Sequence, residues 1–357
     1  MKRILLLPSI LVSGFVQAQE EQKPAFAWSG YVEVYYQYDF NKPADHNRPS
    51  FIYSHNRHNE FNLNLGFLKG SYSSERVRAN LAIAAGTYMN ANYAAEPGVL
   101  KNIYEANAGI KLSRKKNLWL DAGIFSSHIG FESAISKDCW TLTRGILADN
   151  SPYFEAGAKI TYTTNDGKWL LSALALNGWQ RITRVSDNSL MSWGTQIQFK
   201  PNDKVLLNYS TFIGTDKPDS ARLIRIFHNF YGVLNITDKL GLIAGFDIGT
   251  EEKTVTGSGT NTWYTPVGIL RYSFNSKWTI AVRVEHYNDK NGVIIATGTP
   301  HGFQTTGYSF NVDHSPFKNV LIRLEARSFN SKDRIFTKGN SNVKDNTFLT
   351  SSLAVSF

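Results

Sequence analysis

Hydrophobic and polar residues alternate one by one along most of this chain. One stretch places Phe61, Leu63, Leu65 and Phe67 on one side and Asn62 and Asn64 on the other. Because successive side chains of a β-strand point to opposite faces, a period of two indicates a strand with one apolar and one polar face. The pattern recurs from near residue 27 to the carboxyl terminus, so we expect an all-β protein.

This period predicts sixteen strands. They are expected at residues 27–40, 59–70, 77–89, 104–112, 118–125, 153–164, 169–179, 192–199, 205–214, 224–235, 240–250, 262–274, 278–287, 303–313, 320–329 and 347–357. Two of them are less regular. Residues 169–179 are apolar on both parities, and 262–274 contains Pro266, which has no N–H to give to a sheet.

The connections between these strands alternate between short and long. Seven short turns, rich in Asn, Asp, Ser, Pro and Lys, lie at 71–74, 113–117, 165–168, 201–203, 237–239, 275–277 and 315–318. Eight long loops lie at 41–57, 90–103, 126–152, 180–191, 215–223, 251–261, 288–302 and 330–344. This order requires an even number of strands with both chain ends on the short-turn side, as in outer-membrane barrels with periplasmic turns and extracellular loops.

Physical chemistry favours a closed transmembrane antiparallel barrel. A bilayer offers no water to an unpaired strand edge, so a sheet can cross it only when closed, and tilted strands of about ten residues suffice to span it. Aromatic residues near the strand ends form a candidate interfacial girdle: Trp28, Tyr36, Tyr38, Tyr72, Tyr162, Trp169, Trp193, Tyr272, Phe274 and Trp278. A soluble sandwich or propeller is the alternative, but no blade-like repeat is present. Sixteen strands would enclose an aqueous lumen.

The amino terminus indicates export. Lys2 and Arg3 precede an apolar run to Val16, and Ala18 offers a small residue for cleavage, so residues 1–18 read as a signal peptide. The alternative, a membrane anchor, needs a longer apolar run. Cleavage lowers the formal charge from +9 to +7. We expect a flexible lead-in at 19–26 and the barrel at 27–357, without disulfides because Cys139 is the only cysteine.

The third long loop, residues 126–152, is the longest connection and the first candidate for a functional segment. Apolar Ile129, Phe131, Ile135, Trp140 and Leu147 could rest on the barrel wall. That would leave five charged residues to face water, namely Glu132, Lys137, Asp138, Arg144 and Asp149. The hypothesis is that this loop folds back and constricts the lumen; the alternative is that it lies over the outer mouth.

The late strands carry arginines on their polar parity, namely Arg225, Arg271, Arg283, Arg323 and Arg327. They could form a basic wall that faces the third loop across the lumen and favours anions. Alternatively, they could pair with Glu285 and Glu325 as a neutral network. All seven are candidate pore-lining residues.

Other chemistry has weaker support in the sequence. His55 and His58 lie near Glu60 without the spacing of a regular metal site, so we expect no metal and no cofactor. A phospholipase-like barrel enzyme would need a serine beside an outward-facing histidine. His228 and His286 lie on apolar parities but have no serine near them in the sequence. We expect no enzyme. A surface-binding barrel without an open pore is the remaining alternative.

Residues 123–162, GIFSSHIGFESAISKDCWTLTRGILADNSPYFEAGAKITY, resemble the OmpL-like β-barrel porins of Bacteroidota. Gly145 stands where a serine or other small residue is expected in that family. The resemblance implies an outer-membrane porin that lets small hydrophilic solutes or ions diffuse through a water-filled lumen. Its expected partners are outer-membrane lipid, those solutes, and the barrel-assembly machinery through the terminal Phe357. No nucleic acid is expected, and the oligomeric state is open.

Overall fold

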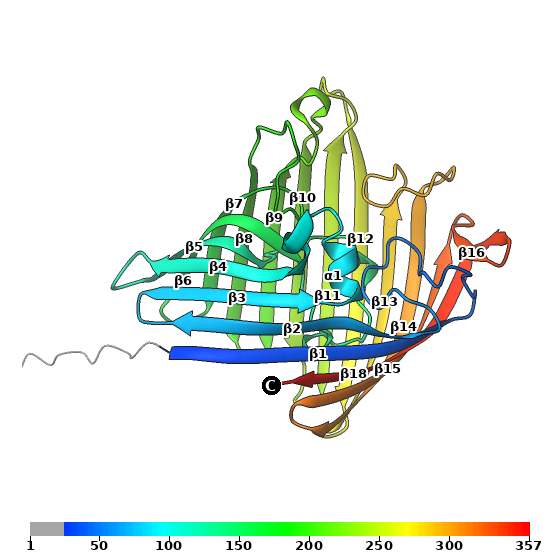
Figure 1. Ribbon diagram of the computed structural model, residues 1–357, viewed down its shortest axis with the longest axis horizontal. Helices are drawn as coiled ribbons and strands as arrows, with labels where there is room; N and C mark the ends of the chain where they lie inside the picture. Colours follow the sequence, from blue (N-terminus) through cyan, green and yellow to red (C-terminus); the bar gives the residue numbers. More distant parts are fainter. Residues whose placement is uncertain (1–24) are drawn as a thin grey trace, which may run out of the picture.

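A computed structural model describes residues 25–357 of the chain. The predicted signal peptide and most of the lead-in lie outside these residues. In the described part, sixteen antiparallel strands close into one barrel, in which β1 pairs with both β2 and β18 (Figure 1). The prediction of a closed sixteen-stranded antiparallel barrel is confirmed.

The strands lie close to their predicted positions. The wall consists of β1 (Ala25–Asp39), β2 (Phe61–Ser73), β3 (Val77–Ala85), β4 (Ile103–Lys111), β5 (Asn117–Ser126), β6 (Phe154–Thr163), β7 (Trp169–Leu176), β8 (Ser192–Asn202), β9 (Val205–Gly214), β10 (Arg225–Asn235), β11 (Leu240–Glu252), β12 (Thr260–Ser273), β13 (Trp278–Asp289), β14 (Phe303–Phe317), β15 (Val320–Ser331) and β18 (Asp345–Ser356). The barrel begins two residues earlier than predicted, because Ala25 and Phe26 already pair with β2.

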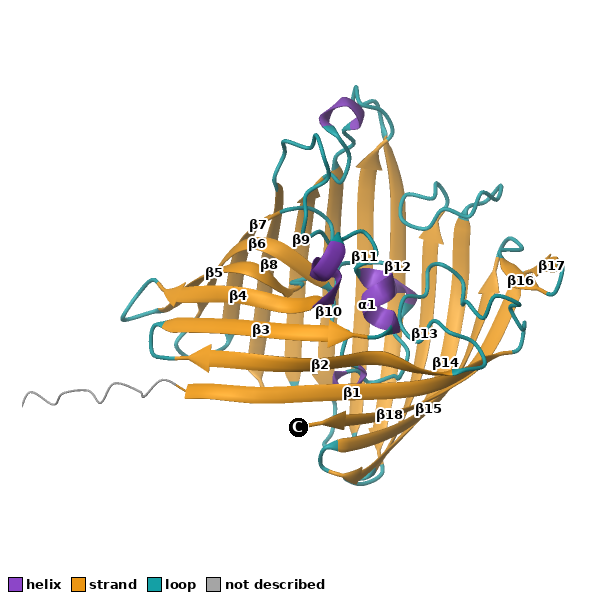
Figure 2. Cartoon of the chain, viewed as in Figure 1, coloured by secondary structure: helices purple, strands orange, loops and turns teal. Residues whose placement is uncertain are grey.

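Short helices and one small hairpin occur only in the long connections of residues 25–357 (Figure 2). They are α1 (Thr87–Asn92), α2 (Ile146–Asp149), the 3₁₀ turns η1 (Gly98–Asn102), η2 (Ser136–Asp138) and η3 (Asp219–Ala221), and the hairpin β16 (Phe336–Lys338) and β17 (Ser341–Val343). None of the helices in this part of the chain is long and apolar enough to cross a membrane.

Pro266 shows how the less regular strand is accommodated. It pairs in register with Phe246 on β11, whereas the ladder between β12 and β13 skips from Tyr264 to Val267. A proline has no N–H to donate, so the ladder is interrupted on the side where that donor would be needed. The rest of β12 keeps its pairing, and the proline does not end the strand.

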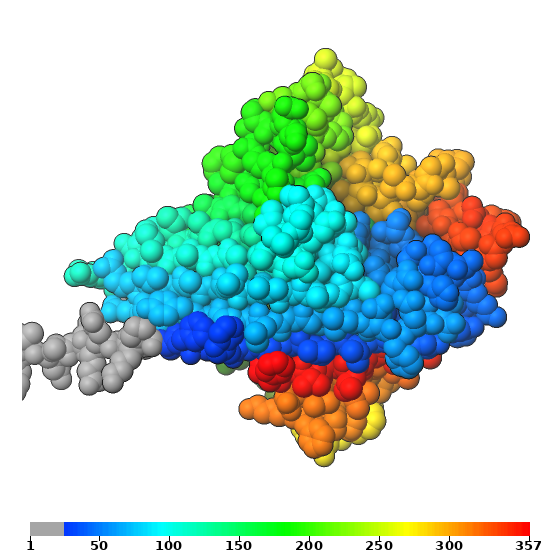
Figure 3. All heavy atoms as spheres, in the orientation of Figure 1, coloured from blue at the N-terminus to red at the C-terminus, as the bar shows by residue number. Residues whose placement is uncertain are grey.

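The first and last strands meet where the barrel closes. The space-filling view shows the first strand beside the last one (Figure 3). Gly30 and Phe357 exchange backbone hydrogen bonds of 2.8 and 3.0 Å. A Cβ atom on Gly30 would lie 2.3 Å from the Phe357 ring, so only glycine lets this ring cover the seam.

The outer surface is apolar, as the alternation predicts, whereas the inner surface carries polar side chains together with buried apolar ones such as Leu65 and Phe212. Exposed side chains on the outside include Val32, Val34, Leu81, Ile83, Val282 and Val284, and the girdle residues Trp28, Trp169, Trp193 and Trp278 are 42–66% exposed. In a water-soluble protein these side chains would form an unusually large exposed apolar surface. Lipid is the environment that such a belt requires.

Candidate functional site

The third long loop, residues 127–153 between β5 and β6, folds into the barrel. Its tip, η2, reaches the first and last strands: Tyr31 Oη lies 3.0 Å from Ser136 Oγ, and Lys137 Nζ donates to Ser356 Oγ at 2.5 Å. Ser356 is the last residue of β18, near the short-turn end of the wall. The loop therefore runs through the lumen rather than over the outer mouth.

One limb of the loop crosses to the middle strands. His128 bonds the carbonyl oxygen of Thr211 on β9 at 2.8 Å, while its other ring nitrogen lies 2.9 Å from Glu155 on β6. The backbone N–H of Gly130 donates to Asn229 Oδ1 on β10 at 3.1 Å. A Cβ on Gly194 would come within 2.6 Å of the His128 ring, so glycine leaves the space that this ring occupies.

Two aromatic side chains of the loop rest on glycines of β11. A Cβ on Gly245 would lie 2.7 Å from the Phe131 ring, and one on Gly241 would lie 2.5 Å from the Trp140 ring. The guanidinium of Arg271 stacks on Trp140, 4.1 Å from the ring centre. The sequence placed Phe131 and Trp140 on the wall-facing side of the loop, and the structure places them there.

Buried charges of β13–β15 bind the backbone of the loop. Arg323 donates to the carbonyl oxygens of Ser136 at 2.5 Å and Cys139 at 3.1 Å. Arg283 donates to Thr143 O, and Arg327 to Arg144 O, both at 2.7 Å. These wall side chains satisfy carbonyl groups that have left water, which would otherwise be costly to bury.

Acidic side chains of the same wall accept the loop's N–H groups. Glu325 accepts from Thr143 N at 2.5 Å, and Glu285 accepts from Ile146 N at 2.6 Å. The late wall, that is β13–β15, thus carries hydrogen-bond donors and acceptors at positions that match the backbone groups of the third loop. Such buried, charge-assisted contacts make the docking specific.

The late-strand arginines do not face the loop across water, which corrects the predicted basic wall. The side chains of Arg283, Arg323 and Arg327 are 0–1% exposed. They form ion pairs with Glu325, Asp313 and Glu285 respectively. Arg225 likewise pairs with Glu251 at 2.7 Å and is 14% exposed. The paired alternative describes these four arginines, because buried guanidinium groups need carboxylate partners, whereas Arg271 stacks on Trp140.

The prediction that the five charged residues of the loop face water is wrong for three of them. Glu132, Arg144 and Asp149 are 8%, 0% and 5% exposed, whereas Lys137 and Asp138 are exposed. Arg144 is turned inward because it donates to three carbonyl oxygens of its own loop, on Ser133, Ala134 and Leu142, at 2.5–2.8 Å. It holds the two limbs of the loop together.

Glu132 and Asp149 are carboxyl groups buried within the loop. Glu132 Oε2 accepts from Gly145 N at 2.8 Å, and Asp149 Oδ1 accepts from the hydroxyls of Ser54 and Tyr153 at 3.2 Å each. Burial raises the pKa of Glu132 and raises that of Asp149 to about 7, although nearby Arg144 acts in the opposite direction at both.

Charges that do reach the lumen lie on the early strands. Lys69 on β2 reaches Glu105 on β4 at 2.5 Å, across Ala82, and Arg78 on β3 reaches Asp121 on β5 at 2.5 Å, across Gly109. The side chains of Lys69 and Arg78 are 26% and 37% exposed. The small residues Ala82 and Gly109 on the intervening strands leave room for each ion pair to connect two strands that are not neighbours.

Arg78, Glu105, Lys111, Asp121 and Lys159 also lie on the polar faces of their strands, but the site prediction did not include them. Nothing local in the sequence distinguishes them from the late arginines. The sequence feature that could have identified them is a small residue, Ala82 or Gly109, at an inward position between two charged residues. This feature can be recognised only once the strand register is known.

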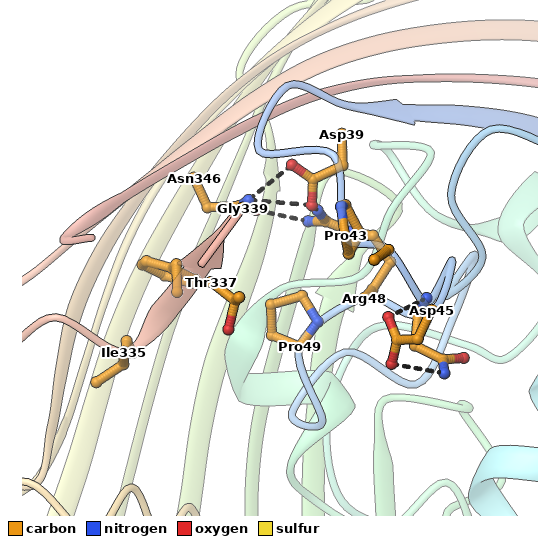
Figure 4. A pocket seen from close by; sticks show the side chains of 12 residues that line it. Asp39, Pro43, Asp45, Arg48, Pro49, Ile335, Thr337, Gly339 and Asn346 are labelled. Carbon is orange, nitrogen blue, oxygen red and sulfur yellow. Dashed lines mark hydrogen bonds and ion pairs between the residues drawn. The ribbon is translucent and has the colours of Figure 1, made fainter. Parts of the chain in front are cut away.

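Three cavities lie around the loops. One of about 180 Å³ is enclosed by the third loop itself and Tyr104 of β4. One of about 350 Å³ lies where several long loops meet above Asp149. The third, about 340 Å³, separates the first long loop from the β16–β17 hairpin. At its edge Arg48, Asp39 and Asn346 bond one another, which ties the first loop to β18 (Figure 4).

The residues considered for metal binding and catalysis have other partners. His55 Nε2 lies 3.3 Å from Glu33, His58 accepts from Asp39 N, and Glu60 binds Arg57. Within residues 25–357, no cluster of three or more His, Cys, Asp or Glu is arranged to hold a metal ion. The outward-facing His228 bonds Tyr209 Oη at 2.8 Å, and His286 bonds Thr306 Oγ1 at 2.9 Å, so neither meets a serine.

Cys139 is a buried residue of the loop rather than an exposed thiol. Its sulfur lies 3.3 Å from Ser133 O and accepts from Ser133 N at 3.2 Å. Burial raises the pKa of this thiol to about 11, so the reactive thiolate is scarce at neutral pH.

Comparison with known proteins identifies the family. The family model described as "Putative beta-barrel porin-2, OmpL-like" matches residues 25–357. No curated protein matches the chain. Similar solved structures include an anion-selective porin from Comamonas acidovorans (10% identity, TM-score 0.60, covering 94% of this chain and 100% of that one). The outer membrane channel DcaP of Acinetobacter baumannii has 11% identity and a TM-score of 0.58, covering 94% and 97%. OmpT of Vibrio cholerae, in its trimer form, has 7% identity and a TM-score of 0.59, covering 94% and 99%. At these identities the likeness concerns the fold.

Proposed function

We propose that this chain, which belongs to the OmpL-like family of β-barrel porins, is a constricted outer-membrane channel for passive diffusion of small hydrophilic solutes and ions. The observation that carries the proposal is the asymmetric lumen. The late wall is occupied by the third loop, whereas the side chains of Lys69 and Arg78 on the early wall are 26% and 37% exposed. A non-conducting barrel would have no need for hydrated charges there.

The narrow path in this proposal runs between the third loop and β2–β6. The early wall contributes four basic groups, Lys69, Arg78, Lys111 and Lys159, against three acidic ones, Glu105, Asp121 and Glu155. An excess of positive charge on a low-dielectric wall raises the local concentration of anions. We therefore infer a weak preference for anions.

Export and assembly complete the proposal. Residues 1–18 would direct the chain across the inner membrane, and Phe357, which is 70% exposed on the barrel seam, would be read by the assembly machinery. The long loops would then face outward and the short turns the periplasm.

Planar-bilayer recording of the purified mature protein tests the channel. We expect ohmic current steps and, in a KCl gradient, a reversal potential of the sign that anions produce. A folded protein that gives no current but hydrolyses phospholipid would establish the enzyme alternative instead. A folded protein with neither activity would establish a surface-binding barrel.

A further inference from the structure

The cavity above Asp149 is built by an arched segment of the fourth long loop, residues 178–183. Gln180 has a φ of +57°, a left-handed conformation that is unfavourable for a residue with a side chain. Such strain persists only where surrounding contacts impose it, and it is concentrated at ligand sites. The conformation of Gln180 therefore marks the arch as a place to look for a site.

Three other loops hold this arch. Glu96 of the second loop, 2% exposed, accepts from Ile182 N at 2.9 Å and Thr183 N at 3.0 Å. Asp216 of the fifth loop accepts from Trp179 N at 2.9 Å. From the third loop, Tyr153 N donates to Gln180 Oε1 at 2.7 Å. The arch is a fixed part of the structure, and the side chains around it are held in place.

An open ion pair faces the cavity. Arg181 and Asp216 both line it, with side chains 27% and 19% exposed. Arg181 Nε lies 4.0 Å from Asp216 Oδ2, which is beyond hydrogen-bonding distance. Val293 and Ile294 of the seventh loop supply an apolar side. The volume of about 350 Å³ is within the range of small-molecule sites.

These features select a chemical class. A simple anion could bind Arg181 but would be repelled by Asp216 and by Asp149 below it, and a simple cation would meet Arg181 and Arg225. A molecule with a carboxylate and an ammonium group on one carbon complements both charges and adds no net charge. It would replace one long ion pair with two charge-assisted contacts.

We propose that this cavity is a low-affinity capture site for small zwitterions, that is, α-amino acids and very short peptides. Arg181 holds the carboxylate, Asp216 holds the ammonium group, and Val293 and Ile294 contact the side chain. The inference rests on the proposed channel, for which the site would raise the solute concentration at the mouth. Weak binding suits that role, since a tightly held solute would not leave.

Saturation-transfer NMR on the mature protein in detergent micelles tests the site without requiring conduction. We expect L-alanine to bind saturably, and its two single-charge analogues, propionate and ethylamine, to bind at least about tenfold more weakly. Arg181→Gln and Asp216→Asn should each weaken alanine binding about tenfold, because each removes one charged contact. Asparagine at 216 can still accept from Trp179 N, so the arch should stay folded.

Arg222→Gln is the matched control. Arg222 is also a half-exposed loop arginine beside an aspartate, Asp219, but neither lines this cavity. It should leave alanine binding unchanged. Equal binding of propionate and alanine, or alanine binding that survives Arg181→Gln, would overturn the inference. Alanine binding by a protein that gives no current would overturn the channel and leave the site intact.

Discussion

At the scale of single residues, Gly145 shows how closely the third loop is fitted. It lies between two buried carboxylates, and a Cβ there would be 2.9 Å from Glu132 Oε2 and 3.2 Å from Glu285 Oε2. Its φ of −59° is open to any residue, so space and not backbone conformation requires glycine. The sequence suggested that any small residue would serve, but the contacts leave no room even for a methyl group.

Gly145→Ala should therefore destabilise the docked loop by about 1–3 kcal/mol, the usual cost of inserting a methyl group into a packed site. Denaturant unfolding of the protein in detergent measures this change. Gly268→Ala on β12 is the control, because a Cβ there has no atom within 4 Å. Equal stability of the two variants would show that the loop is not tightly packed around residue 145.

Asp149 predicts a pH dependence. Burial raises its pKa to about 7 in the folded protein, against 3.8 ordinarily. The folded state thus holds this proton more tightly than the unfolded state, so the contribution to stability is present below about pH 4 and is lost as the pH rises to about 7. The raised pKa of Glu132 acts in the same direction; Arg283 and Arg144 oppose the shift at Glu132, and Arg327 and Arg144 oppose it at Asp149.

We expect the free energy of unfolding to fall between about pH 4 and 7, by an amount on the order of 1–3 kcal/mol. Asp149→Asn should flatten this slope, since asparagine can keep the oxygen that accepts from Ser54 and Tyr153. Unfolding curves at several pH values compare the two proteins. An identical slope in the variant would assign the pH dependence to other groups.

At the scale of elements, the strands were predictable and the loop's contacts were not. A strand can be recognised within ten residues, because its period of two is a local pattern. Even β12 forms near its predicted position despite Pro266. For the third loop, the local sequence predicts only its length. Where the loop backbone docks on the wall depends on Glu285, Arg323 and Arg327, which are 139–187 positions from the loop residues that they bind. No local pattern carries that information.

The loop itself yields the next prediction. Deleting residues 132–146 removes the segment docked on β13–β15 while β5 and β6 remain. We expect a several-fold rise in single-channel conductance, because the freed wall opens to water. Removing the β16–β17 hairpin, residues 336–343, is the control, since these two strands pair with each other and not with the strands of the barrel. Unchanged conductance in a folded deletion variant would show that the loop does not limit the pore.

At the scale of the whole molecule, the charged residues of the inner wall fall into two groups. On β13–β15 its charges are buried and satisfy the backbone of a loop, so mutation there should act through stability. On β2–β6 the side chains of Lys69 and Arg78 are 26% and 37% exposed, and mutation of these two should act through selectivity with little loss of stability, because exposed ion pairs contribute only about 0–1 kcal/mol. The two halves of one barrel therefore give separable phenotypes.

Lys69→Gln combined with Lys159→Gln tests this division. The double variant leaves Glu105 and Asp121 with less positive charge around them, so the reversal potential in a KCl gradient should shift towards that of a cation-preferring channel. Lys239→Gln with Lys277→Gln removes the same charge from exposed short turns and should leave the potential unchanged. A shift of equal size in both variants would mean that net charge, not the early wall, sets selectivity. A shift in the first alone would place the ion path beside Lys69 and Lys159 on the early wall.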